Sequence, residues 1–189
     1  MNKSTTTGLK SNVTRIILAA AVGLLVWSSG AAAQDTMAEA VQQTGCNWLI
    51  DKWAGETPDG QKYELEYKWA LKDHVISMHF KGFDFEYHGI IFFDADKQEV
   101  VQIGVDSNGG NGKATWFAEY GKATMRNEQK GEYGEVSRMG FVYNKIDDQT
   151  MKMEVYGLDE YGQLSEEPGA TLEYKRQKKQ AAKKPTAAK

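Results

Sequence analysis

The chain is poor in cysteine and histidine, and it lacks the common catalytic motifs. Cys46 is the only cysteine in 189 residues, which excludes an intramolecular disulfide. We find no His-Glu-x-x-His, no nucleophile elbow, no phosphate-binding Gly-x-x-x-x-Gly-Lys and no Cys-x-x-Cys. The fold must therefore be stabilised by burial and strand pairing alone, and we expect a protein that is not an enzyme.

Long apolar runs are missing except at the N-terminus. Residues 16–27 are apolar, follow three basic residues without any acid, and lead into Ala31-Ala32-Ala33. This layout is typical of a secretory signal peptide, and twelve residues fall short of the about 20 that span a bilayer. We expect residues 1–33 to be a signal peptide cleaved after Ala33, and the mature protein to be periplasmic or secreted. An uncleaved N-terminal anchor is the alternative.

Charge is distributed unevenly along the chain. Residues 175–189 hold seven basic residues and no acid, whereas between residues 34 and 174 only 13 basic residues face all 26 acids. An acidic body binds nucleic acid poorly, so we expect no nucleic-acid partner. We expect residues 177–189 to form a disordered basic tail. The tail either serves only to keep the protein soluble or, as the alternative, contacts anionic surfaces.

The body of the chain alternates between polar and apolar residues with period two. Between Gln61 and Leu71, the residues Tyr63, Leu65 and Tyr67 fall on one side and charged residues fall on the other. Such alternation predicts a strand with one buried face. Ten runs of this kind are separated by turn residues: 48–56, 61–71, 74–81, 83–93, 99–106, 113–120, 122–130, 135–146, 150–158 and 170–176.

Ten closely spaced strands without a sustained helical periodicity predict an all-β fold. We expect a single antiparallel up-and-down β-barrel over residues 48–176, after a polar lead-in at residues 34–47 with room for a short helix. Closure removes the exposed edges of a sheet, and ten strands leave space for a small ligand inside. We do not expect the protein to span a membrane.

The three histidines form a metal site only if they converge. If a two-residue turn at residues 81–82 joins the third and fourth strands, His79 faces Asp84 and lies about 13 Å from His88 along the strands. His74 then points to the opposite face. This register excludes a shared zinc ion and makes the His79–Asp84 contact a surface pair. We therefore expect no metal.

Two further chemical alternatives stay open at this stage. A hydrolase that uses His79 with Asp84 or Glu86 has no nucleophile within reach in the sequence. The loop at residues 106–112 places oxygen ligands in alternate positions, as calcium loops do, but it lacks their distal bidentate acid. Loops that need a positive φ angle use the same asparagine and glycine residues.

Aromatic residues are the remaining signal for a ligand. Apolar side chains on the inward positions can line a cavity for a flat hydrophobic molecule, or they can simply fill the barrel. Seven residues are the candidates for ligand contact: Tyr67, Trp69, Met78, Phe85, Tyr87, Trp116 and Phe141.

Four stretches carry a resemblance to a known family: WLIDKWAG at residues 48–55, YKWAL at 67–71, GIIFFD at 89–94 and LEYKR at 172–176. They resemble an uncharacterised family of secreted bacterial lipocalin-like domains, similar in outline to calycin and nitrobindin-type ten-stranded barrels. The resemblance implies a barrel around a small hydrophobic ligand. It also implies that Trp53 of the first strand packs against Arg176 of the last.

Nitrobindin-type barrels bind haem through a histidine near their C-terminal strands. No histidine follows His88 here, so the resemblance does not carry haem ligation over, and we expect no cofactor. Haem held by His79, His88 or Met78 remains an alternative. The sequence thus predicts an exported lipocalin-like barrel that binds a small hydrophobic ligand; a structural or envelope-interaction protein without a ligand is the second hypothesis.

Overall fold

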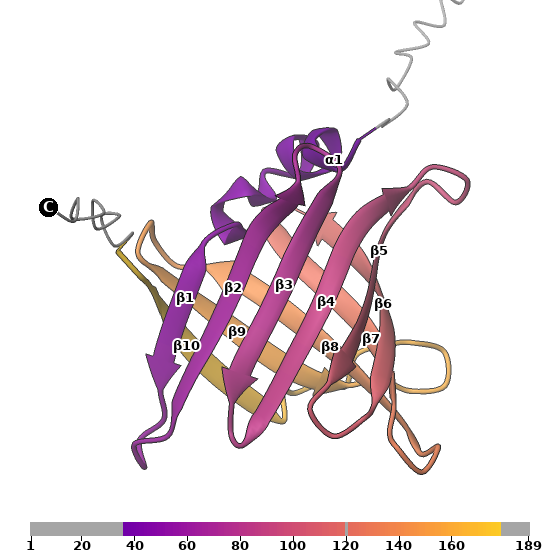
Figure 1. Ribbon diagram of the computed structural model, residues 1–189. Helices are drawn as coiled ribbons and strands as arrows, with labels where there is room; N and C mark the ends of the chain where they lie inside the picture. Colours follow the sequence, from indigo (N-terminus) through magenta and orange to yellow (C-terminus); the bar gives the residue numbers. More distant parts are fainter. Residues whose placement is uncertain (1–35, 120, 179–189) are drawn as a thin grey trace, which may run out of the picture. The chain divides into compact units, whose positions relative to one another are not determined.

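The computed structural model describes residues 36–119 and 121–178, and it shows one closed antiparallel barrel of ten strands (Figure 1). Each strand pairs with its neighbours in sequence, and β10 pairs with β1 to close the ring. The all-β up-and-down barrel predicted from the sequence is confirmed. The expected signal peptide and the tail from residue 179 onward lie outside the described residues.

The strands follow one another without crossover. Their bounds are β1 Lys52–Glu56, β2 Lys62–Leu71, β3 Val75–Gly82, β4 Phe85–Asp94, β5 Glu99–Asp106, β6 Asn111–Glu119, β7 Lys122–Lys130, β8 Val136–Lys145, β9 Thr150–Gly157 and β10 Ala170–Arg176. Inward side chains alternate with outward ones along each strand, as the period-two pattern requires. In β2, for example, Tyr63, Leu65 and Tyr67 are buried while Lys62 and Glu64 are exposed.

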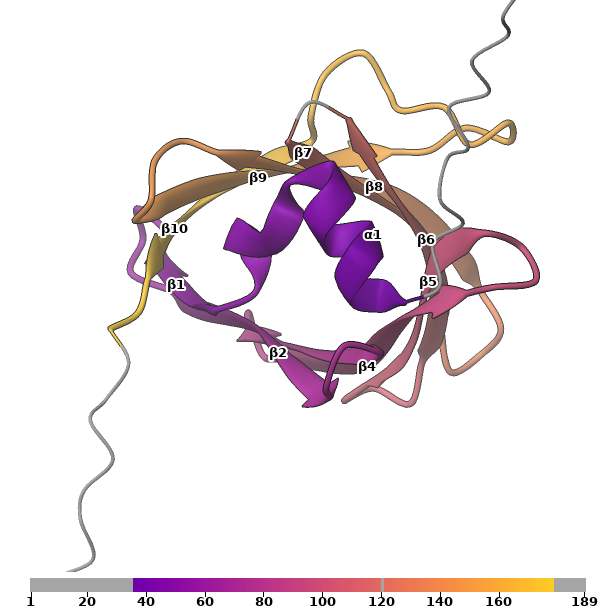
Figure 2. The ribbon, with the colours of Figure 1, turned by 90° about the horizontal axis from the view of Figure 1, so that it is seen from above.

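A short helix and a helical turn precede the barrel and cover one of its ends. Helix α1 (Met37–Thr44) begins with a capping box at Thr36, and the 3-10 helix η1 (Cys46–Leu49) follows. Figure 2 shows α1 lying across the ring of strands when the barrel is seen from above. Met37 and Val41 of α1 are buried against the core because they share one face of the helix.

The beginning of the barrel differs from the prediction. Residues 48–51 were expected to start the first strand, but Cys46–Leu49 form η1 and β1 begins only at Lys52. The local cause is hydrogen bonding within this segment: the Ile50 backbone N–H donates to Asn47, and the Trp53 indole donates to the Leu49 carbonyl at 3.0 Å. These bonds hold the segment in a helical turn over the end of the barrel.

The turn between β3 and β4 also differs from the prediction. Strand β3 continues through Gly82, and the two turn residues are Phe83 and Asp84, both with positive φ angles of 58° and 56°. A type I′ turn has this geometry. Gly82 lies in the strand directly under the Tyr63 side chain, which is possible because a Cβ at residue 82 would be only 2.6 Å from Tyr63 Cβ. The shift of two residues keeps every side chain on its predicted face but changes its partner.

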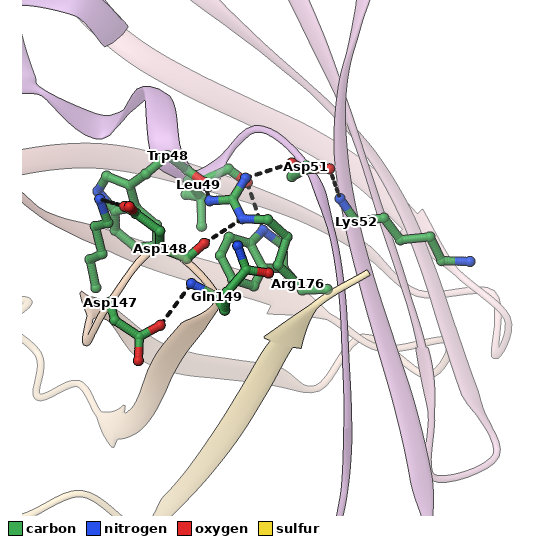
Figure 3. Close-up of polar contacts among 10 residues, drawn as sticks. Trp48, Leu49, Asp51, Lys52, Asp147, Asp148, Gln149 and Arg176 are labelled. Carbon is green, nitrogen blue, oxygen red and sulfur yellow. Dashed lines mark hydrogen bonds and ion pairs between the residues drawn. The ribbon is translucent and has the colours of Figure 1, made fainter. Parts of the chain in front are cut away.

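Arg176 joins the end of β10 to the segment that enters β1 (Figure 3). Its guanidinium pairs with Asp51 at 2.5 Å and donates to the carbonyl oxygens of Trp48 at 3.0 Å and Asp148 at 2.7 Å. It also lies over the fully buried Trp53 ring, 4.4 Å from the ring centre. The contact between Trp53 and Arg176 that the resemblance implied is therefore present, and it is a structural contact at the barrel seam.

Candidate ligand-binding cavity

The barrel contains a cavity of about 260 Å³ on the side of its centre away from α1. The lining is mostly apolar and comes from eight of the ten strands. The lining residues are Leu65, Met78, Phe80, Phe85, Tyr87, Gln102, Met125, Asn127, Gln129, Met139, Phe141, Tyr143, Met153, Val155 and Leu172. Among these described residues none is charged. The combination of an apolar wall and a few polar groups is typical of small-molecule sites.

Burial differs between the two ends of this cavity. Residues near its inner end, such as Leu65, Gln102 and Tyr143, are each 1% exposed. Residues near its outer end, such as Phe80 and Leu172, are only half-buried. These outer residues adjoin the strand connections at the end of the barrel opposite α1. The cavity is therefore more accessible to solvent at this end than at its inner end.

An aromatic floor formed by Tyr67, Trp116 and Tyr143 separates the cavity from the space under α1. Trp116 and Tyr143 stack with ring centres 5.5 Å apart, and Tyr67 meets both rings edge to face. Tyr67 and Trp116 line a smaller apolar space of about 90 Å³ together with Met37 and Cys46. Burial raises the pKa of the Cys46 thiol, which disfavours a reactive thiolate.

The structure divides the seven predicted contact residues into three groups. Met78, Phe85, Tyr87 and Phe141 line the cavity. Tyr67 and Trp116 belong to the aromatic floor. Trp69 does not line the cavity: it is 37% exposed beside the point where the pairing of β2 with β3 shifts register. The alternation that predicted all of them describes faces of a strand, and it carries no information about depth along the barrel.

A hydrogen-bonded chain of three side chains runs along the wall formed by β4, β5 and β6. The Trp116 indole N–H donates to Gln102 Oε1 at 3.0 Å, and Gln102 Nε2 donates to the Tyr87 hydroxyl at 3.1 Å. Gln102 is buried and its sequence neighbourhood is an ordinary strand. Sequence reasoning missed it; its only signal is a polar residue at an inward position of an apolar strand.

A row of glycines gives this wall its shape. Gly89, Gly104 and Gly112 lie side by side on β4, β5 and β6. A methyl group at Gly104 would collide with the Tyr87 hydroxyl, so the Tyr87 ring can lie flat across the wall only because residue 104 has no side chain. Glycine in the interior of three neighbouring strands is a sequence signal for such close approach, and it was not used in the prediction.

A second polar pair lies between β2 and β8. The Tyr67 hydroxyl is 3.1 Å from the Tyr143 hydroxyl, and both rings are almost fully buried. Burial, and beside it the neighbouring Tyr143 phenol, holds the pKa of Tyr67 well above its usual value. Burial likewise raises the pKa of Tyr143 and of Tyr87. These phenols therefore stay protonated at neutral pH.

The histidines lie outside this site. His79 contacts Glu86 at 2.7 Å and faces His88 across the β3–β4 pair, with ring centres 5.2 Å apart. The predicted His79–Asp84 pair and the 13 Å separation are wrong because the turn lies two residues further along the chain. Both histidines point away from the interior, opposite in phase to Met78 and Tyr87, so neither lines the cavity.

The glycine-rich loop after β5 uses its carboxylate within the protein. Asp106 accepts hydrogen bonds from the backbone N–H groups of Asn108 and Gly110 and from Gln129 Nε2. Aspartate side chains commonly stabilise loops through hydrogen bonds of this kind to the backbone. Across residues 36–119 and 121–178, no group of three or more His, Cys, Asp or Glu side chains is placed to hold a metal ion.

In the part of the chain that the structure describes, no helix is long and apolar enough to cross a membrane. A scan against models of known protein families finds no match to the chain, and a search of the curated proteins finds none either.

Proposed function

We propose that the protein binds a small hydrophobic molecule inside its barrel. The observation that carries this proposal is the apolar cavity of about 260 Å³, whose inner end is buried and whose outer end is half-buried. An apolar cavity of about 150 Å³ accommodates one benzene molecule, so this one suits a compact ligand of about ten non-hydrogen atoms. Longer molecules fit if part of them extends past the outer rim.

Methionine methyl groups offer a direct test. Met78, Met125, Met139 and Met153 line the cavity, whereas Met37 and Met151 do not. In a titration of the ¹³C-methyl-methionine protein with indane, a bicyclic hydrocarbon of nine carbons, we expect the four cavity signals to shift together and saturate. Absence of any saturable shift up to the solubility limit of indane would contradict the proposal.

A matched pair of variants identifies the binding site. Val155 lines the cavity and is half-buried. Val155→Trp therefore fills part of the cavity with an indole, and we expect this variant to lose the indane response. Val105→Trp adds the same ring to the outer face of β5, where Val105 is 60% exposed, and is expected to bind indane like the original protein. Equal loss in both variants would mean that the response comes from another surface.

The proposal includes export and kinship with lipocalin-like barrels. The capping box at Thr36 lies after Ala33, so removal of residues 1–33 leaves α1 and all ten strands intact. The Trp53–Arg176 contact supports the kinship. The mass of the protein recovered from the periplasm or the medium tests export, because cleavage after Ala33 predicts a chain of 156 residues. Recovery of the full-length chain from the cytoplasm would contradict it.

The alternative function is a structural or envelope-interaction protein without a ligand. The methionine-methyl titration distinguishes the two functions, because a barrel without a ligand predicts that indane leaves the signals of the cavity methionines unchanged. The cavity favours the binding role, because a purely structural barrel gains stability by filling its interior.

A further inference from the structure

We propose that the ligand is electrically neutral and carries a carbonyl group, or an equivalent oxygen acceptor, at its inner end, held by the hydroxyl groups of Tyr87 and Tyr143. This inference rests on the proposed ligand-binding function and specifies its chemistry. It follows from counting the hydrogen bonds that the groups at the inner end of the cavity can still form.

The Tyr87 hydroxyl has a proton without an acceptor. An indole N–H can only donate, so Trp116 fixes Gln102 with its carbonyl oxygen toward the indole and its amide NH₂ toward Tyr87. The Tyr87 oxygen therefore accepts a hydrogen bond from Gln102. The remaining O–H of Tyr87 has no acceptor among the described residues, and Tyr87 lines the cavity.

The Tyr67–Tyr143 pair leaves a second donor. One hydroxyl of the pair donates to the other, so only one of their two protons is used. Tyr67 lies in the floor on the side of α1, and Tyr143 lines the cavity. Donation from Tyr67 to Tyr143 leaves the free O–H on the residue that faces the cavity, where a ligand can accept it. The opposite direction would leave a buried hydrogen without any partner.

Asn127 adds a third unused polar group. Its side chain is 7% exposed, lines the cavity from β7, and has no hydrogen-bond partner among the described residues. Its amide group is therefore available to bond to a ligand oxygen or to a bridging water. Together Tyr87, Tyr143 and Asn127 present donors to one apolar cavity.

The described lining of the cavity holds no charged side chain, and this favours a neutral ligand. No lysine, arginine or histidine side chain lines the cavity, so a carboxylate or phosphate would be buried without a counter-ion. The carboxylate of Asp106, which accepts a hydrogen bond from the lining residue Gln129, further disfavours an anion. Two phenol donors are instead suited to a ketone, aldehyde, quinone or amide oxygen.

A pair of probes of equal shape tests the carbonyl. Indane and 1-indanone differ only by one ketone oxygen, and indanone is the more water-soluble of the two. In the methionine-methyl titration we expect indanone to bind about tenfold more tightly, the gain of one or two buried hydrogen bonds. The carbonyl stretching band of bound indanone is also expected at a lower frequency than in a hydrocarbon solvent.

Tyrosine-to-phenylalanine variants assign the effect to the two donors. Tyr87→Phe and Tyr143→Phe are each expected to lower indanone affinity severalfold, to leave indane affinity unchanged, and to move the carbonyl band back. Tyr174→Phe is the control, because Tyr174 is also a buried tyrosine but does not line the cavity. It is expected to bind both probes like the original protein.

The outcomes separate this inference from the proposed function. If neither probe shifts the cavity methionines, both the proposed function and the inference are overturned. If indane binds as tightly as indanone, or indanone keeps its advantage in both tyrosine variants, the cavity binds ligands but the carbonyl assignment is wrong. If indane-1-carboxylate binds more tightly than indanone, the ligand is an anion and the claim of neutrality is overturned.

Discussion

Tyr67 and Tyr174 place two phenol hydroxyls inside one barrel in opposite hydrogen-bonding states. The Tyr67 hydroxyl pairs with Tyr143, whereas the Tyr174 hydroxyl is the one buried side-chain polar atom without a partner among the described residues. Tyr174 is retained by its ring, which packs edge to face on Tyr63 at 4.9 Å. At the scale of residues, the interior therefore combines well-packed aromatic rings with hydroxyl groups that do not form all of their possible hydrogen bonds.

The two tyrosines should therefore respond differently to loss of the hydroxyl. We expect Tyr174→Phe to raise the free energy of unfolding by about 1 kcal/mol, because it removes an unpaired buried group. Tyr67→Phe should lower it by about 1 kcal/mol, because the Tyr143 hydroxyl loses its partner. Urea denaturation of the two variants measures both changes. A loss of stability in Tyr174→Phe that equals that of Tyr67→Phe would show that the Tyr174 hydroxyl is paired in solution.

At the scale of elements, the barrel depends on how its first and last segments are joined. Strand β1 pairs with only two residues of β10, at Trp53 and Ala54, which makes this the shortest strand pairing in the ring. The side chain of Arg176 supplements it by bonding to the segments at Trp48 and Asp51 and to the loop before β9. One planar cation thus links three segments that are distant in sequence.

Arg176→Lys is expected to lower the free energy of unfolding by about 2 kcal/mol. Lysine keeps the charge, but it cannot reproduce the planar set of donors or lie over the Trp53 ring in the same way. Arg138→Lys is the control, since Arg138 pairs with Glu128 at an exposed site and should change stability by less than about 0.5 kcal/mol. Thermal or urea unfolding of both variants tests this; equal effects would mean that the seam gains nothing from the guanidinium.

At the scale of the whole molecule, several tyrosines are buried in one interior. The free energy of unfolding therefore depends on pH in the alkaline range. Burial raises the pKa of Tyr67, Tyr143 and Tyr174 above the value of 10.0 that they have when exposed. Above pH 10 the unfolded chain releases these protons while the folded chain keeps them. The folded state then binds more protons, and stability falls as pH rises.

We expect the loss to approach about 1.4 kcal/mol per pH unit above pH 10 for each tyrosine that stays protonated in the folded state. Urea unfolding between pH 8 and pH 11 measures the slope. Tyr174→Phe should reduce the slope by up to about 1.4 kcal/mol per pH unit, while the lysine contribution stays the same in both proteins. An unchanged slope in that variant would mean that Tyr174 ionises in the folded state.

Two features could not be predicted from the sequence: the position of the turn between β3 and β4, and the depth of each inward residue along the barrel. Phe83 is a poor candidate for a type I′ turn by residue type, yet the turn lies at Phe83 and Asp84, and Gly82 lies in the strand under Tyr63. Trp69 has the same phase as Tyr67, yet only Tyr67 is buried. Neither difference follows from local alternation, because both depend on the strands that lie alongside.

The sequence by itself determined the strands, their inward faces and the closed all-β architecture, since period-two alternation is a local property that acts over a few residues. Only the tertiary structure decided which inward side chains meet. Tyr67 bonds to Tyr143, 76 positions away, and Arg176 pairs with Asp51, 125 positions away. The cavity and its unused donors arise from such distant contacts, because barrel closure and strand register bring them together.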